Sequence, residues 1–162
     1  MTEAGAVFSR DRGWRTLLWR CWDRSLPVAN FIMLNPSTAD EHKLDPSCTR
    51  ARNYAERWGF GGILVTNLFA FRSTQPEKLK TAKDPVGRGN DAAIVKAAKR
   101  AALVVCAWGN HGRYRGRSAA LLRKLLEENI PLHALRVGAQ GEPAHPLYLP
   151  GTLRPRRWRP RA

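Results

Sequence analysis

Four short apolar runs are spaced along the chain, and segments with helical periodicity separate them. The runs span residues 28–34, 61–69, 103–108 and 132–137. Such runs are typical of strands buried on both faces of a sheet. Parallel strands need crossovers of a dozen or more residues, usually helical, and the intervening segments are long enough to provide them. The sequence therefore predicts an α/β fold, namely a three-layer α/β/α sandwich around a mainly parallel four-stranded sheet.

Three segments between the apolar runs carry helix signals. Asp45 provides an N-cap before Pro46, a residue favoured at the first helical position, and Gly59 ends this helix. Asn90 is expected to cap the second helix. The third spans residues 117–129 and has leucines on one face.

The two ends of the chain differ from its middle in amino-acid pattern. Residues 14–22 are rich in tryptophan and predict an N-terminal strand or hairpin. With 162 residues in all, we expect residues 1–150 to form one domain. Residues 151–162 form an Arg/Pro-rich tail with too little apolar content to order itself.

The charge balance points to a polyanionic partner. Lysine and arginine number 28 against 13 acidic residues, a formal net charge of +15. Such an excess creates a positive field over the whole molecule. No apolar segment approaches the roughly 20 residues that span a bilayer, and the N-terminus lacks a signal-peptide pattern. We therefore predict a cytoplasmic protein that binds nucleic acid and no membrane.

The cysteines and histidines do not predict a metal site. Cys21, Cys48 and Cys106 are far apart in the sequence and odd in number, so we expect buried free thiols. The four histidines are also scattered; they are His42, His111, His133 and His145. No metal and no cofactor is expected.

Polar or aromatic residues follow each predicted strand. Asn35 comes after the first, Asn67 near the end of the second, Trp108 at the end of the third, and the fourth leads towards His145. In open α/β sheets, ligands bind beyond the carboxyl ends of the strands. We therefore expect these residues to converge at one edge of the sheet.

Three segments resemble motifs of the uracil-DNA glycosylase superfamily, in the same chain order. FIMLNPS resembles its first motif, VTNLFAFRSTQP the segment with a base-reading asparagine, and AHPLYLP the second catalytic motif. Met33 replaces the usual glycine of the first motif, and Leu147-Tyr148 replaces Ser-Pro in the last. The chain is still more similar to the bacterial and phage family called domain of unknown function 1643, through LNPSTAD, NLFA, AWG and HPLYL.

The glycosylase resemblance implies an enzyme that flips a nucleotide out of the stack and hydrolyses its N-glycosidic bond. Asn67 would read the pyrimidine edge, since a carboxamide offers donors and an acceptor. His145 would donate to the departing base, where negative charge develops, and Asn35 would orient a water. Ser37 occupies a position where a bulky residue excludes 5-substituents, so the small serine implies that uracil or 5-substituted uracil is accepted.

Further side chains complete the predicted site. The base pocket would also include Leu34, Phe69, Trp108, Leu147 and Tyr148. Phosphate contacts are expected from Arg72, Arg113, Arg115, Arg154, Arg156, Arg157 and Arg159. The expected partner is DNA, including single-stranded or lesion-containing DNA, and RNA stays open as an alternative.

Each functional interpretation has a structural alternative. The Asn35-Pro36-Ser37 segment is also a standard strand-ending turn, and Asn67 could instead hold loop backbone. For Asp45, an N-cap is favoured over a catalytic carboxylate, while Asp40 is a secondary candidate for activating water. The tryptophans of the N-terminal half are better explained as core, and the tail arginines could be a solvated charge run.

Two other functions stay open beside the glycosylase. One is a noncatalytic nucleic-acid-binding module on the same fold, and the other is a phage-type enzyme that modifies a base without releasing it. A Ser-His-Asp hydrolase is disfavoured, because the sequence has no Gly-x-Ser-x-Gly elbow.

Overall fold

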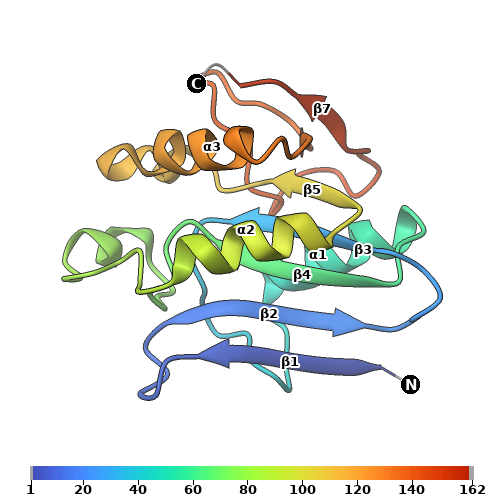
Figure 1. Cartoon of the computed structure of the whole chain (residues 1–162), viewed down its shortest axis with the longest axis horizontal. Helices are drawn as coiled ribbons and strands as arrows, with labels where there is room; N and C mark the ends of the chain where they lie inside the picture. Colours follow the sequence, from blue (N-terminus) through green and yellow to red (C-terminus); the bar gives the residue numbers. More distant parts are fainter. Residues whose placement is uncertain (1, 161–162) are drawn as a thin grey trace.

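A single seven-stranded sheet runs through the protein (Figure 1). The computed structural model describes residues 2–160. The strands are β1 (Glu3–Phe8), β2 (Arg15–Cys21), β3 (Val28–Met33), β4 (Gly62–Asn67), β5 (Leu103–Cys106), β6 (Leu132–Ala134) and β7 (Arg156–Trp158). Their order across the sheet is β1-β2-β4-β3-β5-β6-β7.

The centre of the sheet is parallel and its margins are antiparallel. β3 pairs in parallel with β4 and β5, and β5 pairs in parallel with β6. The β1–β2 hairpin adds to β4 antiparallel, and β7 adds to β6 antiparallel. The α/β class is thus confirmed. The expected four-stranded sheet is corrected to seven strands of mixed direction.

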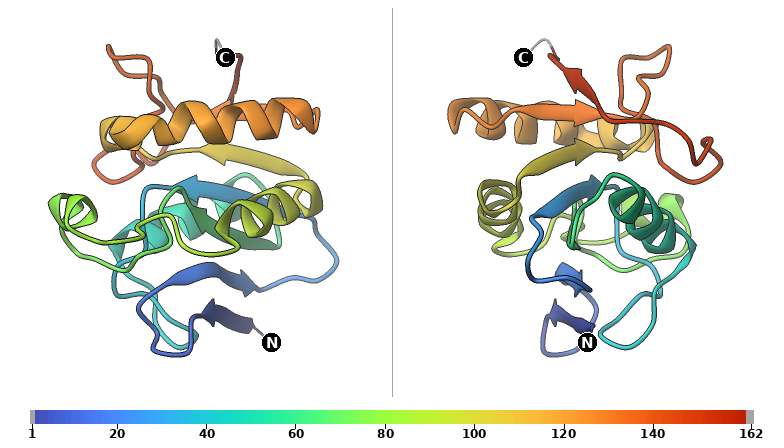
Figure 2. Two further views of the ribbon diagram at one scale, coloured as in Figure 1. Left: turned by 60° about the vertical axis from the view of Figure 1, so that its left-hand side comes forward. Right: turned by 90° about the vertical axis from the view of Figure 1, so that its right-hand side faces the viewer.

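Helices cover both faces of the sheet. They are α1 (Pro46–Arg57), α2 (Asn90–Arg100) and α3 (Arg117–Glu127), with two 3-10 helices, η1 (Pro76–Lys80) and η2 (Asn110–Gly116). Figure 2 shows α1 on one side of the sheet and α2 and α3 on the other. Two separate apolar clusters match this division, one shared with α1 and one with α2 and α3.

Alternation along β3 explains why the predicted strands are mostly apolar on both faces. Successive strand side chains point to opposite faces. Phe31 and Met33 belong to the cluster under α1, whereas Ile32 and Leu34 belong to the cluster under α2 and α3. A strand with helices on both faces is therefore buried on both, and Asn30, the one polar residue of β3, is fully buried as well.

The strands end earlier than the apolar runs that predicted them. β3 ends at Met33 and β5 at Cys106, but Leu34 and Trp108 beyond them are still buried. The apolar runs in the sequence therefore indicated which residues are buried rather than which residues pair in the sheet. The loops that leave the carboxyl edge are consequently packed into the protein at their first residues.

The start of α2 differs from the prediction. The N-cap is Gly89, whose φ of 74° suits glycine, rather than Asn90. The Asn90 side chain instead donates to the backbone oxygens of Asn67 at 2.9 Å and Leu68 at 3.1 Å. Asn90 thus fixes the end of β4 from the neighbouring helix.

The expectation that residues 151–162 do not order themselves is wrong for the described part. Residues Arg156–Trp158 form β7, with Trp158 opposite Leu132. The Trp158 ring meets the Trp108 ring edge-on, with centroids 5.9 Å apart. One aromatic contact and the hydrogen bonds of a strand pair hold this segment in place. The amino-acid composition of the segment cannot reveal such contacts. Residues 161 and 162 lie outside the described residues.

No helix within residues 2–160 has the length and apolarity needed to cross a bilayer.

Candidate functional site

A cavity of about 550 Å³ opens at the carboxyl ends of the parallel strands. This volume lies in the range of about 300–1,000 Å³ typical of small-molecule sites. Its walls come from the loops after β3, β4 and β5, the first turn of α1, and the segment before β7. The lining residues are Leu34, Asn35, Ser37, Asp45, Pro46, Ser47, Ser73, Thr74, Pro76, Trp108, Gly109, Asn110, His111, His145 and Leu147.

A glycine brings the histidine segment against the end of β5. Gly109 has a φ of 75°, and its N–H donates to the oxygen of Pro143 at 2.8 Å. A Cβ at position 109 would lie 3.6 Å from the Cβ of His145. The left-handed turn at Gly109 therefore lets His145 lie beside the strand end.

Asn35 is half-buried in the cavity wall, and its amide orientation follows from its contacts. Its Nδ2 donates to the oxygens of Pro36 at 3.0 Å and Ser73 at 2.8 Å. Both amide hydrogens are used, so the side chain offers the cavity its Oδ1 as an acceptor. The same two bonds join the loop after β3 to the loop after β4.

The contacts of His145 define its neutral form. Its Nδ1 accepts a hydrogen bond from the backbone N–H of Leu147 at 3.2 Å. The neutral ring therefore carries its proton on Nε2. Burial lowers the pKa of His145 below its usual value of 6.5, and the nearby negative charge of Asp45 acts in the opposite direction. Near neutral pH the ring is an uncharged Nε2–H donor.

Asp45 is the N-cap of α1, as predicted, and it also lines the cavity. Its Oδ1 accepts from the N–H of Cys48 at 2.9 Å, and its Oδ2 accepts from the N–H of Ala39 at 3.3 Å. The residue is 8% exposed. It is the only carboxylate among the lining residues, all of which lie in the described chain.

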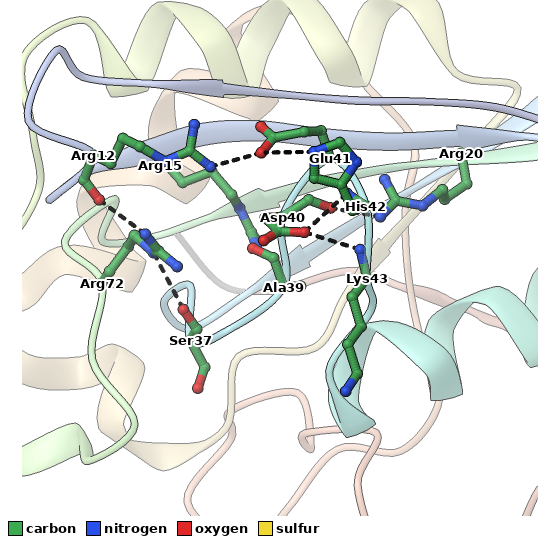
Figure 3. A network of polar contacts seen from close by, with 10 residues as sticks. All are labelled: Arg12, Arg15, Arg20, Ser37, Ala39, Asp40, Glu41, His42, Lys43 and Arg72. Atoms are coloured by element: carbon green, nitrogen blue, oxygen red, sulfur yellow. Dashed lines mark hydrogen bonds and ion pairs between the residues drawn. The ribbon is translucent and has the colours of Figure 1, made fainter.

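Arginines hold the cavity loop, which we define as residues 34–45, by its backbone oxygens (Figure 3). Arg72 donates to the oxygen of Ser37, Arg15 to that of Ala39, and Arg20 to that of Asp40. Part of the basic excess is therefore internal. It fixes a loop that carries cavity residues.

Asp40 belongs to this network rather than to the cavity. Its carboxylate accepts from the N–H groups of His42 at 2.8 Å and Lys43 at 2.9 Å. These bonds lower the pKa of Asp40, which closes a turn on the exposed side of the loop. This position does not support a role for Asp40 in activating water.

Asn67 does not reach the cavity. Its side chain is 2% exposed, and its Oδ1 accepts from Nη2 of Arg15 at 3.2 Å. It lies on the α1 side of the sheet beneath the cavity loop. The expectation that Asn67 joins Asn35 and His145 around one cavity is therefore corrected.

The predicted pocket residues divide into two groups. Leu34, Ser37, Trp108 and Leu147 line the cavity. The other two lie elsewhere: Phe69 is buried in the core, and Tyr148 is 91% exposed.

Sequence reasoning missed several polar residues of the cavity. Ser73 and Thr74 come from the loop after β4, and Asn110 and His111 open η2. The position of Asn110 and His111 directly after the third apolar run was a usable signal, since loops after parallel strands build such sites. Nothing local in the sequence marks Ser73 or Thr74.

The loop arginines among the predicted phosphate contacts are engaged within the protein. Arg72 also donates to the oxygen of Arg12 at 3.1 Å, and Arg113 donates to the side chain of Gln140 at 3.0 Å. The Arg115 guanidinium lies 5.2 Å from the ring centroid of Tyr114.

Two of the four tail arginines line a second groove. Arg154, Arg156, Arg157 and Arg159 are exposed. A groove of about 410 Å³ is lined by Arg136, Arg156, Arg157 and Trp158, among others. Between residues 129 and 160 the only acidic residue is Glu142, which is buried. Among residues 2–160, no carboxylate forms an ion pair with these arginines.

The cysteines are free thiols. Cys48 and Cys106 are buried as predicted, whereas Cys21 is only half-buried. Burial raises the pKa of Cys48 to about 12, with Arg15 opposing and Asp45 reinforcing the shift, and burial also raises the pKa of Cys106. Within the described residues, no group of three or more His, Cys, Asp or Glu is arranged to hold a metal ion.

Together these features define an α/β domain with a cavity at the carboxyl ends of its parallel strands, lined by both polar and apolar residues. The chain belongs to the family described as "Protein of unknown function (DUF1643)", whose model matches residues 15–147. This confirms the resemblance to domain of unknown function 1643 that the sequence showed. No curated protein and no solved structure matches the chain.

Proposed function

We propose that the protein is a DNA glycosylase-like enzyme that hydrolyses the N-glycosidic bond of a flipped-out damaged or modified pyrimidine, uracil or a 5-substituted uracil. The observation that carries the proposal is the cavity shared by Asn35 and His145, two residues from opposite ends of the chain. The four parallel strands with helices on both faces are compatible with a uracil-DNA glycosylase-like sandwich. The cavity lies where such a sheet binds its ligand.

His145 has the chemical form that the reaction requires. Cleavage of the bond leaves negative charge on the departing base. A fixed N–H that points at this charge binds the transition state more strongly than the ground state. The neutral His145 ring offers its Nε2–H for this purpose, because its Nδ1 already accepts from Leu147.

Asn35 supports the nucleophile side of the reaction. Its Nδ2 is committed to two backbone oxygens, so its Oδ1 is held in a fixed position. An oriented acceptor can hold a water for attack on the sugar carbon. The adjacent Ser37 is small and leaves room for a substituent at the 5-position of a pyrimidine.

The exposed arginines support DNA as the partner. A groove with Arg136, Arg156 and Arg157 on its walls and no acidic side chain among its lining residues suits a phosphate backbone. Trp158 in this groove packs on Trp108 of the cavity. A strand held along β7 would therefore run close to the cavity.

The environment of Asn67 favours a second candidate function. If no carboxamide reads the base, the cavity could hold a nucleotide without releasing it, and the protein would be a noncatalytic nucleic-acid-binding module. Asn67 is buried and bonded to Arg15, which is the observation behind this alternative. In the enzyme proposal, another polar group of the cavity must read the base.

Base release from defined oligonucleotides tests the proposal. Single- and double-stranded DNA carrying uracil, 5-hydroxymethyluracil or hypoxanthine would be incubated with the protein and treated with alkali, which cuts abasic sites. We expect cleavage at a pyrimidine lesion that is lost in Asn35→Ala and His145→Ala. Tight binding with no cleavage on any substrate would favour the noncatalytic module.

A matched control keeps this test specific. His42 is an exposed histidine of the cavity loop that does not line the cavity. His42→Ala should cleave at the wild-type rate. Thermal melts of all variants would show whether the loss in Asn35→Ala reflects unfolding, since that change removes two loop hydrogen bonds.

A further inference from the structure

The cavity contains one carboxylate for which the proposed reaction has so far no use. Asp45 lies in the wall that also presents Asn35 and His145. It is 8% exposed, and backbone N–H groups of Cys48 and Ala39 each hold one of its oxygens. Its orientation is therefore fixed, and each oxygen keeps a further lone pair for another donor.

Hydrolysis of a glycosidic bond makes demands that Asn35 alone cannot meet. The transition state resembles an oxocarbenium ion, and the usual solution places a carboxylate beside it. The attacking water must also lose a proton. An amide is far too weak a base to take it, whereas a carboxylate can.

From this juxtaposition we infer that Asp45 is a catalytic residue that activates the attacking water. The inference rests on the proposed glycosylase function. The water oxygen, oriented by Asn35, forms the new bond to the sugar C1′ while Asp45 takes its proton. The bond from C1′ to the base breaks, and its electron pair leaves with the base, stabilised by Nε2–H of His145. The proton on Asp45 then passes through solvent to the released base.

A helix N-terminus and a buried arginine lie near Asp45. It caps the positive end of α1, which favours negative charge. The guanidinium of Arg15 lies beneath the cavity loop with 1% exposure and acts electrostatically on both Asp45 and Cys48. The capping role and the catalytic role are compatible, because the cap uses one lone pair of Oδ1.

Two substitutions separate these roles. Asn and Ser cap helices about as well as Asp, but neither provides a carboxylate. We expect Asp45→Asn and Asp45→Ser to fold and to bind lesion DNA with wild-type affinity. Their single-turnover rate of base release should fall by about a hundredfold or more, the range of general-base catalysis.

A purely structural role predicts a different result. If Asp45 only caps α1, both variants should release base within about threefold of the wild-type rate, and this outcome would overturn the inference. Asp40→Asn serves as the matched control. It removes a carboxylate from the same loop, keeps an acceptor for the His42 and Lys43 N–H groups, and should leave the rate unchanged.

The experiment also separates this inference from the proposed function. A wild-type protein that releases base, together with an equally active Asp45→Asn, contradicts the role of Asp45 alone. A wild-type protein that releases no base from any substrate contradicts both. A rate loss with unchanged DNA affinity and melting temperature supports both.

Discussion

The Nε1–H of Trp108 donates to the carboxylate of Glu142 at 2.6 Å, and both side chains are buried. The hydroxyl of Ser118 in α3 donates to the other carboxylate oxygen at 2.7 Å. The buried Glu142 side chain thus joins the cavity wall to α3 and to the segment before His145. Buried carboxylates are stable when donors satisfy them.

Removal of Glu142 should destabilise the protein through the donors it leaves behind. Glu142→Ala strands two buried donors, for a predicted loss of about 2–4 kcal/mol in the free energy of unfolding. Glu142→Gln should cost about 1 kcal/mol, because the Ser118 hydroxyl can rotate and accept from the amide. Urea unfolding of the two variants measures the difference. Equal losses would mean that the carboxylate is not satisfied by these two donors.

Asn67 should behave as a structural residue. In Asn67→Ala the buried Arg15 loses an acceptor, which should cost about 1–3 kcal/mol of unfolding free energy. Because Asn67 lies outside the cavity, any base release should keep its wild-type preference among uracil and 5-substituted uracils. Urea unfolding and the oligonucleotide panel measure the two effects. A changed preference with unchanged stability would restore Asn67 as a base reader.

Much of the fold could be predicted because apolar runs and helix caps are local signals. The parallel strands, the N-terminal hairpin and the Asp45 cap follow from such patterns. The β7 strand could not be predicted. It depends on the pairing of Arg156–Trp158 with a distant strand and on a single tryptophan contact.

Part of the candidate site could also be predicted from local sequence signals. Asn35 and His145 reach the cavity, because loops that follow parallel strands share one edge. Asn67 also stands at the end of a parallel strand, yet its side chain is buried and accepts a hydrogen bond from Arg15. A buried arginine from an antiparallel strand has no local signature, so the sequence could not indicate that this asparagine had a competing partner.

The tail arginines should govern the salt dependence of DNA binding. Arg156 and Arg157 are exposed and line the second groove. The double change Arg156→Ala and Arg157→Ala should weaken binding to any DNA sequence. Each lost phosphate contact should reduce the slope of log affinity against log salt by about 1.

Fluorescence anisotropy over a salt series measures this slope. Arg123→Ala is the control, since Arg123 is an exposed basic residue on α3. It should leave the slope nearly unchanged. Equal effects of the two changes would show that the net charge of the molecule, rather than the groove, attracts DNA.

The titration of His145 reports directly on the cavity. Burial lowers the pKa of His145 below 6.5 in the folded protein. The negative charge of Asp45 raises this pKa, but by less than burial lowers it. Asp45→Asn removes this charge and should lower the pKa of His145 further. Imidazole NMR resonances followed over pH measure both values, and a raised pKa in the variant would contradict the electrostatic effect of Asp45 on His145.

The same shift fixes the sign of a stability effect. Because the folded protein resists protonation of His145, the unfolded chain binds more protons near pH 6, and folding stability should decline as pH falls below about 6.5. His145→Gln should reduce that decline. His133 is the internal reference: burial and the charge of Arg157 lower its pKa, with no contribution from Asp45. Its resonance should therefore titrate identically in the wild type and in Asp45→Asn, so that a movement confined to His145 identifies the effect with the cavity.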